Sequence, residues 1–282
     1  MIDYSQLLLL GAIAGFTIFL GLPLAVMKNL STRKKGFLNA FALGILVFLI
    51  IDVFSHGYET ASDAATAALS GKGSVGDGII DLVAMFGGIA IGLLGLVLYE
   101  IKVMTKRFPQ ILSLENLKQG DEHLKQLFHQ TNAYKLAMMI AVGIGAHNFS
   151  EGLAIGQSYA AGEIGLAILL IIGFGAHNTT EGFGIAGPLT GILKRPTAKF
   201  LLVAGLVGGG PTFVGTVLGS LVFSNVAYIL FLSIAGGALI YVSMLMYNSG
   251  RKFTTNGIMM VGIFIGLCAG FVTDLVVTFG GA

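Results

Sequence analysis

An eight-residue motif rich in metal-binding side chains occurs twice in the chain. The first copy runs from Gly145 to Gly152 and the second from Gly175 to Gly182, and six of the eight positions are identical. Each copy holds a histidine, an asparagine directly after it and a glutamate four positions after the histidine. Because positions i and i+4 share one face of a helix, each copy presents an imidazole and a carboxylate in one direction. Such ligands suit Zn²⁺, Fe²⁺, Mn²⁺, Co²⁺ or Cd²⁺.

If the two helix faces meet, two imidazoles and two carboxylates form one pocket, in which the carboxylates balance the charge of one divalent cation. The four ligands of this predicted metal site are His147, Glu151, His177 and Glu181. The amides of Asn148 and Asn178 are expected to add carbonyl oxygens or hydrogen bonds that orient the ligands. A buried hydrogen-bond cluster that only ties two helices together is the alternative, and the duplication of the motif favours the metal site.

The rest of the chain has the composition of a membrane protein. Of its 282 residues, 55% are hydrophobic and 11% are charged, whereas soluble proteins carry about 25% charged residues. So few charges cannot cover a soluble domain, which excludes a soluble enzyme, a nucleic-acid-binding protein and a disordered scaffold. The single cysteine, Cys268, excludes a disulfide framework and a cysteine-rich metal site.

Long apolar runs divide the chain into eight predicted membrane-spanning helices, since each span needs about 20 mostly apolar residues. They lie near residues 5–27, 36–57, 79–101, 134–159, 163–189, 198–222, 226–247 and 255–279. The polar pair Ser224 and Asn225 marks the hairpin between the sixth and seventh spans. The chain is therefore predicted to be an all-α integral membrane protein with a single transmembrane domain, residues 1–282.

The motif copies fall near the middle of the fourth and fifth spans, which a short connection makes antiparallel neighbours. A carboxylate at the bilayer centre costs about 2.5 to 3.5 kcal/mol or more, so ionisable residues at that depth are functional by default. The motif residues are therefore expected to form a functional site at the midplane.

Basic residues predict the orientation of the chain, because cytoplasmic connections collect Lys and Arg. All of the 16 Lys and Arg residues except Lys72 lie in or near the connections after the first, third, fifth and seventh spans. The longest of these is a cytoplasmic loop at about residues 105–133. Both termini are therefore expected to lie outside the cell membrane.

Residues 147–152, His-Asn-Phe-Ser-Glu-Gly, and residues 177–182, His-Asn-Thr-Thr-Glu-Gly, resemble the paired metal-binding helices of the ZIP (Zrt/Irt-like) divalent metal transporters. The resemblance in topology extends over the whole chain, and its specific motifs are confined to spans four and five. It implies an eight-helix bundle with an inverted repeat and commonly a homodimer. It also implies ligand roles for Asn148 and Asn178 beside the two His-Glu pairs.

Three features depart from the family pattern. Ser150 and Thr180 replace the proline that usually precedes the motif glutamate, so that any kink must come from hydroxyl groups bonded to the preceding turn. Span six reads Gly-Leu-Val-Gly-Gly-Gly-Pro at residues 205–211, where many relatives carry a further glutamate. Span seven lacks the acidic residue that relatives often carry near its inner end.

A metal entrance is predicted at the outer ends of spans two and eight. Asp52 and His56 stand at i and i+4 near the end of span two, and Asp274 lies near the end of span eight. These side chains would attract cations to the mouth of the protein. A water-exposed pair at the membrane edge explains Asp52 and His56 equally well, since span ends tolerate charge.

Together these features predict a transporter that carries divalent transition metals across the bilayer into the cytoplasm. Zinc is the main expected substrate, and iron, manganese and cadmium are expected as further substrates. The metal is then the substrate, and no prosthetic group, nucleic acid or enzymatic activity is expected. An intramembrane metal-dependent hydrolase is one alternative, although no His-Glu-x-x-His motif supports it. A metal-binding sensor that does not transport is the other.

Overall fold

The computed structural model describes residues 3–27, 31–107, 122–160, 162, 164–192, 194–221, 224–251 and 254–279, which contain helices and no strand. The α-helices are α1 (Tyr4–Phe16), α2 (Ile18–Gly21), α3 (Thr32–Leu69), α4 (Val75–Tyr99), α5 (Thr105–Arg107), α6 (Glu122–Ala160), α7 (Ile164–Ala186), α8 (Ala198–Gly219), α9 (Asn225–Gly250) and α10 (Asn256–Phe279). Short 3₁₀ segments, η1 (Leu22–Val26) and η4 (Gly187–Gly191), follow α2 and α7, and a π-helical segment, η2 (Glu100–Met104), follows α4.

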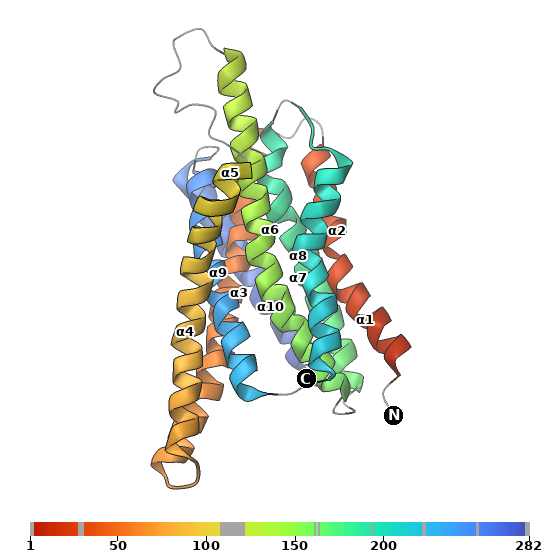
Figure 1. Cartoon of the computed structure of the whole chain (residues 1–282). Helices are drawn as coiled ribbons and strands as arrows, with labels where there is room; N and C mark the ends of the chain where they lie inside the picture. The colour runs from red at the N-terminus through yellow and green to blue at the C-terminus, as the bar shows by residue number, and fades with distance from the viewer. Residues whose placement is uncertain are drawn as a thin grey trace.

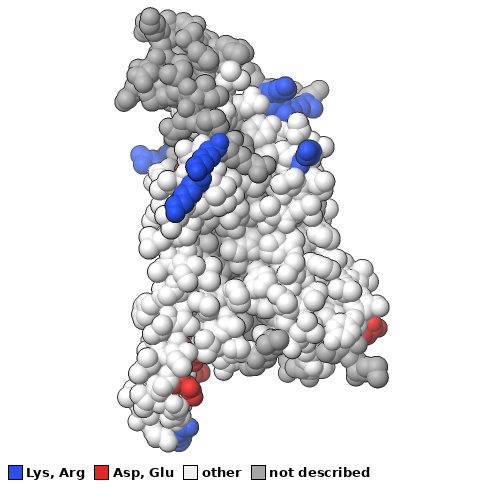
Figure 2. Space-filling model, in the orientation of Figure 1, with Lys and Arg blue, Asp and Glu red and all other residues white. Residues whose placement is uncertain are grey.

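The long helices lie side by side in one bundle (Figure 1). Both chain termini lie at the same end, which we call the terminal end. Lys and Arg gather at the opposite end, which we call the basic end, while the visible Asp and Glu lie toward the terminal end (Figure 2). Between the two ends the visible surface is almost free of charge, as expected for a protein surrounded by lipid.

Six described segments are long and apolar enough to cross a membrane. They are Tyr4–Val26, Arg33–Leu69, Val75–Met104, Ala198–Gly219, Asn225–Gly250 and Asn256–Leu275. These match six of the predicted spans, and Ser224 caps α9 at the predicted hairpin by accepting a hydrogen bond from the Ala227 N–H. The remaining two long helices, α6 and α7, carry the polar motifs and do not meet this criterion within the described residues.

Two helices extend beyond the predicted spans, because charged residues interrupt an apolar run without ending a helix. Helix α3 continues past the predicted end near residue 57 to Leu69, so Asp52 and His56 lie inside the helix and not at its end. Helix α6 begins at Glu122, and α5 covers Thr105–Arg107, so the loop predicted at residues 105–133 is partly helical. The rest of that loop, residues 108–121, lies outside the described residues.

Glycines let several helix pairs approach until their backbones touch. A Cβ on Gly152 of α6 would collide with the Thr212 carbonyl oxygen of α8, and one on Gly92 of α4 would collide with the Ile234 carbonyl oxygen of α9. A Cβ on Gly266 of α10 would collide with the Phe41 carbonyl oxygen of α3. This close packing is what small residues spaced four apart provide in membrane helices.

An apolar core fills the bundle between the motif residues and the basic end. Ile144 and Ile140 precede His147 on α6, while Ile185 and Leu189 follow Glu181 at the end of α7 and in η4. These four side chains have 0 to 1% of their surface exposed. The core therefore closes the bundle on the side of the motifs that faces the basic end.

Candidate metal centre

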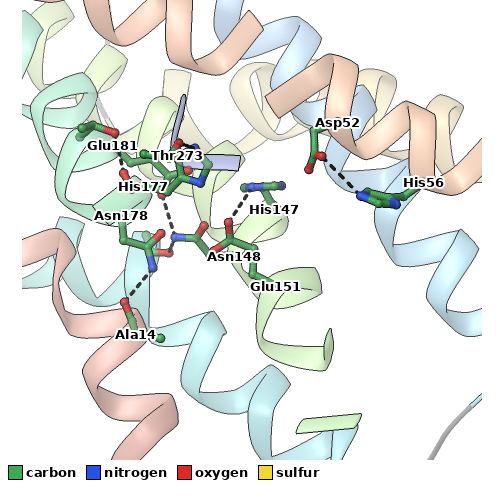
Figure 3. A network of polar contacts seen from close by, with 12 residues as sticks. Ala14, Asp52, His56, His147, Asn148, Glu151, His177, Asn178, Glu181 and Thr273 are labelled. Carbon is green, nitrogen blue, oxygen red and sulfur yellow. Dashed lines mark hydrogen bonds and ion pairs between the residues drawn. The ribbon is translucent and has the colours of Figure 1, made fainter. Parts of the chain in front are cut away.

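The α6 motif places an imidazole beside a carboxylate, as the i and i+4 spacing predicted (Figure 3). His147 Nε2 lies 3.2 Å from Glu151 Oε1, and the two residues are only 3% and 5% exposed. The contact lacks the geometry of a hydrogen bond, so both Glu151 oxygens and both His147 nitrogens are buried without a hydrogen-bond partner. Polar groups left in this state cost about 1 to 3 kcal/mol each, and more when charged.

The α7 motif contacts helices that lie far from it in the sequence. His177 Nε2 lies 3.2 Å from the Thr273 hydroxyl of α10. The His177 ring also stacks on Phe48 of α3, with ring centres 5.7 Å apart. His177 is thus held between two helices that the motif did not indicate.

Glu181 accepts a hydrogen bond from α6. The Asn148 amide nitrogen donates to Glu181 Oε2 at 3.0 Å and to the Gly208 carbonyl of α8 at 3.0 Å. The Asn178 amide nitrogen donates to the Ala14 carbonyl of α1 at 2.8 Å. The side-chain carbonyl oxygens of both asparagines and Glu181 Oε1 accept no hydrogen bond. Both asparagines thus use their amide nitrogens as donors, while their amide oxygens stay without a partner.

Hydroxyl groups replace the family's proline in two different ways. Thr180 Oγ donates to the His177 carbonyl at 2.7 Å, which is the bond to the preceding turn that its position suggested. Ser150 Oγ is buried and unpartnered. Both motifs nevertheless lie within continuous helices, α6 and α7.

A cavity of about 360 Å³ joins the α6 and α7 motifs to the predicted entrance residues. Its lining includes His147, Glu151 and His177 together with the entrance residues Asp52, His56 and Asp274. His56 Nε2 lies 3.4 Å from Asp52 Oδ1, and the His56 side chain is 58% exposed. Glu181, Asn148 and Asn178 do not line this cavity, so the six predicted site residues fall into two groups.

Within the described residues, no three His, Cys, Asp or Glu side chains are grouped closely enough to hold a metal ion as they stand. The predicted ligand set therefore stays a prediction. Its chemistry fits a cation nonetheless, because buried acceptors without hydrogen-bond partners concentrate in the two motifs. A cation is the kind of group that satisfies such acceptors.

Four neighbours of the site were missed by sequence reasoning: Thr273, Phe48, the Gly208 carbonyl and the Ala14 carbonyl. Thr273 directly precedes Asp274, whose charge led to its prediction as an entrance residue. An uncharged hydroxyl group in an apolar run does not by itself indicate a site. Backbone carbonyls do not indicate a site either, because every residue has one.

Comparison with known proteins adds one finding. The family model described as ZIP zinc transporter matches residues 100–274, which include both motifs and reach Asp274. No curated protein matches the chain.

Proposed function

Because the chain belongs to the ZIP zinc transporter family, whose members move divalent metals across membranes, we propose that it carries divalent transition metals into the cytoplasm through its paired His/Glu motifs. Family membership and the apolar helices make it a multi-pass membrane protein. We further propose zinc as the first substrate, with iron, manganese and cadmium also accepted. Imidazole and carboxylate ligands without sulfur suit this set of ions.

The observation that carries the proposal is the set of unpartnered acceptors in both motifs. The oxygens of Glu151, Oε1 of Glu181 and the amide oxygens of both asparagines are buried and accept no hydrogen bond. A structural cluster that ties helices together would pair such atoms, because nearly all buried polar groups in proteins are hydrogen-bonded. A passing cation would bind them in turn.

The cavity supplies a route to Glu151, one of the residues with unpartnered acceptors. It extends from the exposed His56 past Asp52 and Asp274 to the α6 and α7 motifs. The basic end collects Lys and Arg, and cytoplasmic regions of membrane proteins are enriched in these residues. We therefore propose that the basic end faces the cytoplasm and that the cavity and both termini face outside. We propose Asp52, His56 and Asp274 as the entrance that attracts cations and passes them inward.

Two groups of helices are suited to move against each other. In the first, which we call the motif body, glycine seams join α1 and α2 to α7 and α8, and α6 to α8. In the second, the support body, they join α3 to α10 and α4 to α9. Each seam brings a backbone against a backbone and so resists sliding.

Contacts between the two bodies are made by side chains instead. A Cβ on Gly143 of α6 would meet only the side chains of Val242 and Leu96. Near the basic end, Lys135 Nζ of α6 pairs with Glu100 Oε1 of η2 at 2.8 Å. Rigid-body movement of the motif body would break such contacts more easily than the seams and would open the apolar core toward the cytoplasm.

The remaining features come from the family resemblance: location in the cell membrane, an inverted repeat and a homodimer. Membership in a family of transporters agrees with the expected lack of enzymatic activity. The hydrolase would need a metal-bound water and a substrate bond to cleave, and a sensor would bind metal without moving it. Both remain outcomes of the experiment below.

Purified protein in liposomes that enclose a metal-sensitive dye tests the function. Zn²⁺, Mn²⁺, Fe²⁺ and Cd²⁺ are offered outside in turn, with protein-free liposomes as the control. We expect saturable uptake of the offered ion, fastest for Zn²⁺. Metal binding without uptake would identify a sensor and contradict the proposal, and so would release of cleaved lipid or peptide without uptake.

A further inference from the structure

The Thr273 hydroxyl makes three close contacts but has only one proton. Thr273 Oγ1 lies 2.7 Å from the Gly270 carbonyl and 3.1 Å from the Ala269 carbonyl, both in its own helix α10. It also lies 3.2 Å from His177 Nε2. A carbonyl oxygen can only accept, so the proton of the hydroxyl belongs to the α10 backbone. What remains to face His177 is a lone pair.

For Thr273 to accept a hydrogen bond from His177, Nε2 of the imidazole must carry the hydrogen. A neutral imidazole carries its hydrogen on one ring nitrogen and leaves the other as an acceptor. The hydrogen-bond network therefore assigns the hydrogen to Nε2 of His177, and Nδ1 keeps the lone pair that can bind a metal. Among the described residues no hydrogen bond to Nδ1 is present.

We propose that Thr273 is a positioning residue that fixes His177 in the tautomer with hydrogen on Nε2, so that this histidine binds the metal through Nδ1. This inference rests on the proposed function. Hydrogen bonds of this kind, made by the nitrogen that does not bind the metal, set the tautomer and ring direction of metal-binding histidines.

Phe48 keeps the His177 ring from turning over, which would carry Nε2 away from Thr273 and leave the carbon Cε1 in its place. Its ring stacks on His177 at an interplanar angle of 27°. Phe48 is itself only 3% exposed and is packed edge-on against Phe271 of α10, with ring centres 5.0 Å apart. A ring flip of His177 would have to displace the buried Phe48 ring from this position.

The contact also joins the two bodies defined above. His177 belongs to α7 of the motif body, whereas Thr273 and Phe48 belong to α10 and α3 of the support body. The tautomer suited to Nδ1 binding is thus set only in the arrangement in which the cavity is open at the terminal end. Movement of the motif body would carry His177 away from the Thr273 hydroxyl oxygen. The imidazole would then lose its preference for the tautomer that binds metal through Nδ1, which favours release of the metal on the other side.

Nuclear magnetic resonance of isotopically labelled histidine in bilayers tests the assignment without metal or transport. Signals of His177 are identified by their loss in His177→Gln. We expect a protonated Nε2 and an unprotonated Nδ1 in the wild type and in Thr273→Ser, and a mixture of tautomers in Thr273→Val. Thr216→Val is the matched control, since the buried Thr216 hydroxyl donates only to its own helix, to the Thr212 carbonyl at 2.9 Å. A wild type with the hydrogen on Nδ1, or a Thr273→Val tautomer identical to wild type, would overturn the proposal.

Cadmium, in an isotope visible to the same method, then reports the nitrogen that binds. We expect coupling between the cadmium and Nδ1 of His177, and a metal affinity about 10- to 100-fold weaker in Thr273→Val, restored in Thr273→Ser. Coupling to Nε2 would contradict the inference even if transport is normal. A protein with the expected tautomer that binds cadmium through Nδ1 without moving it would instead contradict the proposed transport alone.

Discussion

Glu151 is the residue on which the proposed metal site depends most directly. Both of its oxygens are buried and accept no hydrogen bond, and the nearest imidazole nitrogen, His147 Nε2, lies 3.2 Å away. Removing one partner of a buried ion pair usually destabilises a protein, because it leaves the other charge unpaired. Removing a buried charge that has no partner instead removes its desolvation free energy and can stabilise the protein. We therefore expect Glu151 to lower the stability of the metal-free protein and to raise that of the metal-bound protein.

Thermal unfolding with and without Zn²⁺ measures both effects. We expect Glu151→Gln to unfold at the same temperature as the wild type or higher in the absence of metal. Zn²⁺ at 100 times its Kd should stabilise the wild type by about 2.7 kcal/mol and should leave Glu151→Gln unchanged. Glu59→Gln, an exposed carboxylate on the same side of the bundle, should respond to Zn²⁺ like the wild type. A normal response of Glu151→Gln would remove this residue from the site.

Metal binding by the motif histidines should compete with protons. Imidazole binds a metal only when neutral, carboxylates only when ionised, and binding therefore releases protons. Histidine charges between about pH 5 and 8, so metal affinity should be highest near pH 7 and fall as the pH drops toward 5. Titrations with Cd²⁺ across this range, in wild type and His177→Ala, provide the measurement. An affinity independent of pH in both proteins would argue that the imidazoles do not bind the metal.

At the scale of helices, glycine position matters more than glycine content. Gly92 and Gly95 lie one turn apart on α4, but only Gly92 faces another backbone. A Cβ on Gly92 would collide with the Ile234 carbonyl of α9, whereas a Cβ on Gly95 has no atom within 4 Å. Gly92→Ala should therefore lower stability by about 1 to 3 kcal/mol or more, and Gly95→Ala should be neutral or slightly stabilising because alanine favours helix. Size-exclusion profiles after heating distinguish them, and equal loss in both would contradict the backbone seam.

Sequence reasoning located most helices and both motifs, because apolar runs and the i, i+4 spacing are local properties. It ended the second span too early, since Glu59 and Asp63 interrupt the apolar run while the Ala-rich stretch after them keeps α3 helical to Leu69. It could not find Phe48 or Thr273, because which helices surround His177 depends on packing between distant segments. The pairing of Asn148 with Glu181 was hidden for the same reason.

At the scale of the whole molecule, the cavity and the apolar core describe a conformation open at the terminal end and closed at the basic end. Single cysteines introduced into the cysteine-free variant Cys268→Ser test this arrangement and its orientation. Ala154→Cys lies in the cavity lining, whereas Leu189→Cys lies in the core with 1% of its surface exposed. A membrane-impermeant thiol reagent added outside intact cells should label Ala154→Cys, more slowly when Zn²⁺ is present, and should not label Leu189→Cys. Labelling of Leu189→Cys alone would reverse the proposed direction of opening.

The most direct test of the central claim is the initial rate of Zn²⁺ uptake into liposomes by wild type, Glu151→Gln and Glu181→Gln, with Glu59→Gln as control. Each motif glutamine leaves one negative charge where a divalent cation needs two, among buried residues where excess charge is costly. The account predicts that both motif variants are folded but lose uptake, while Glu59→Gln keeps the wild-type rate. Wild-type uptake in both motif variants would contradict transport through the paired motifs.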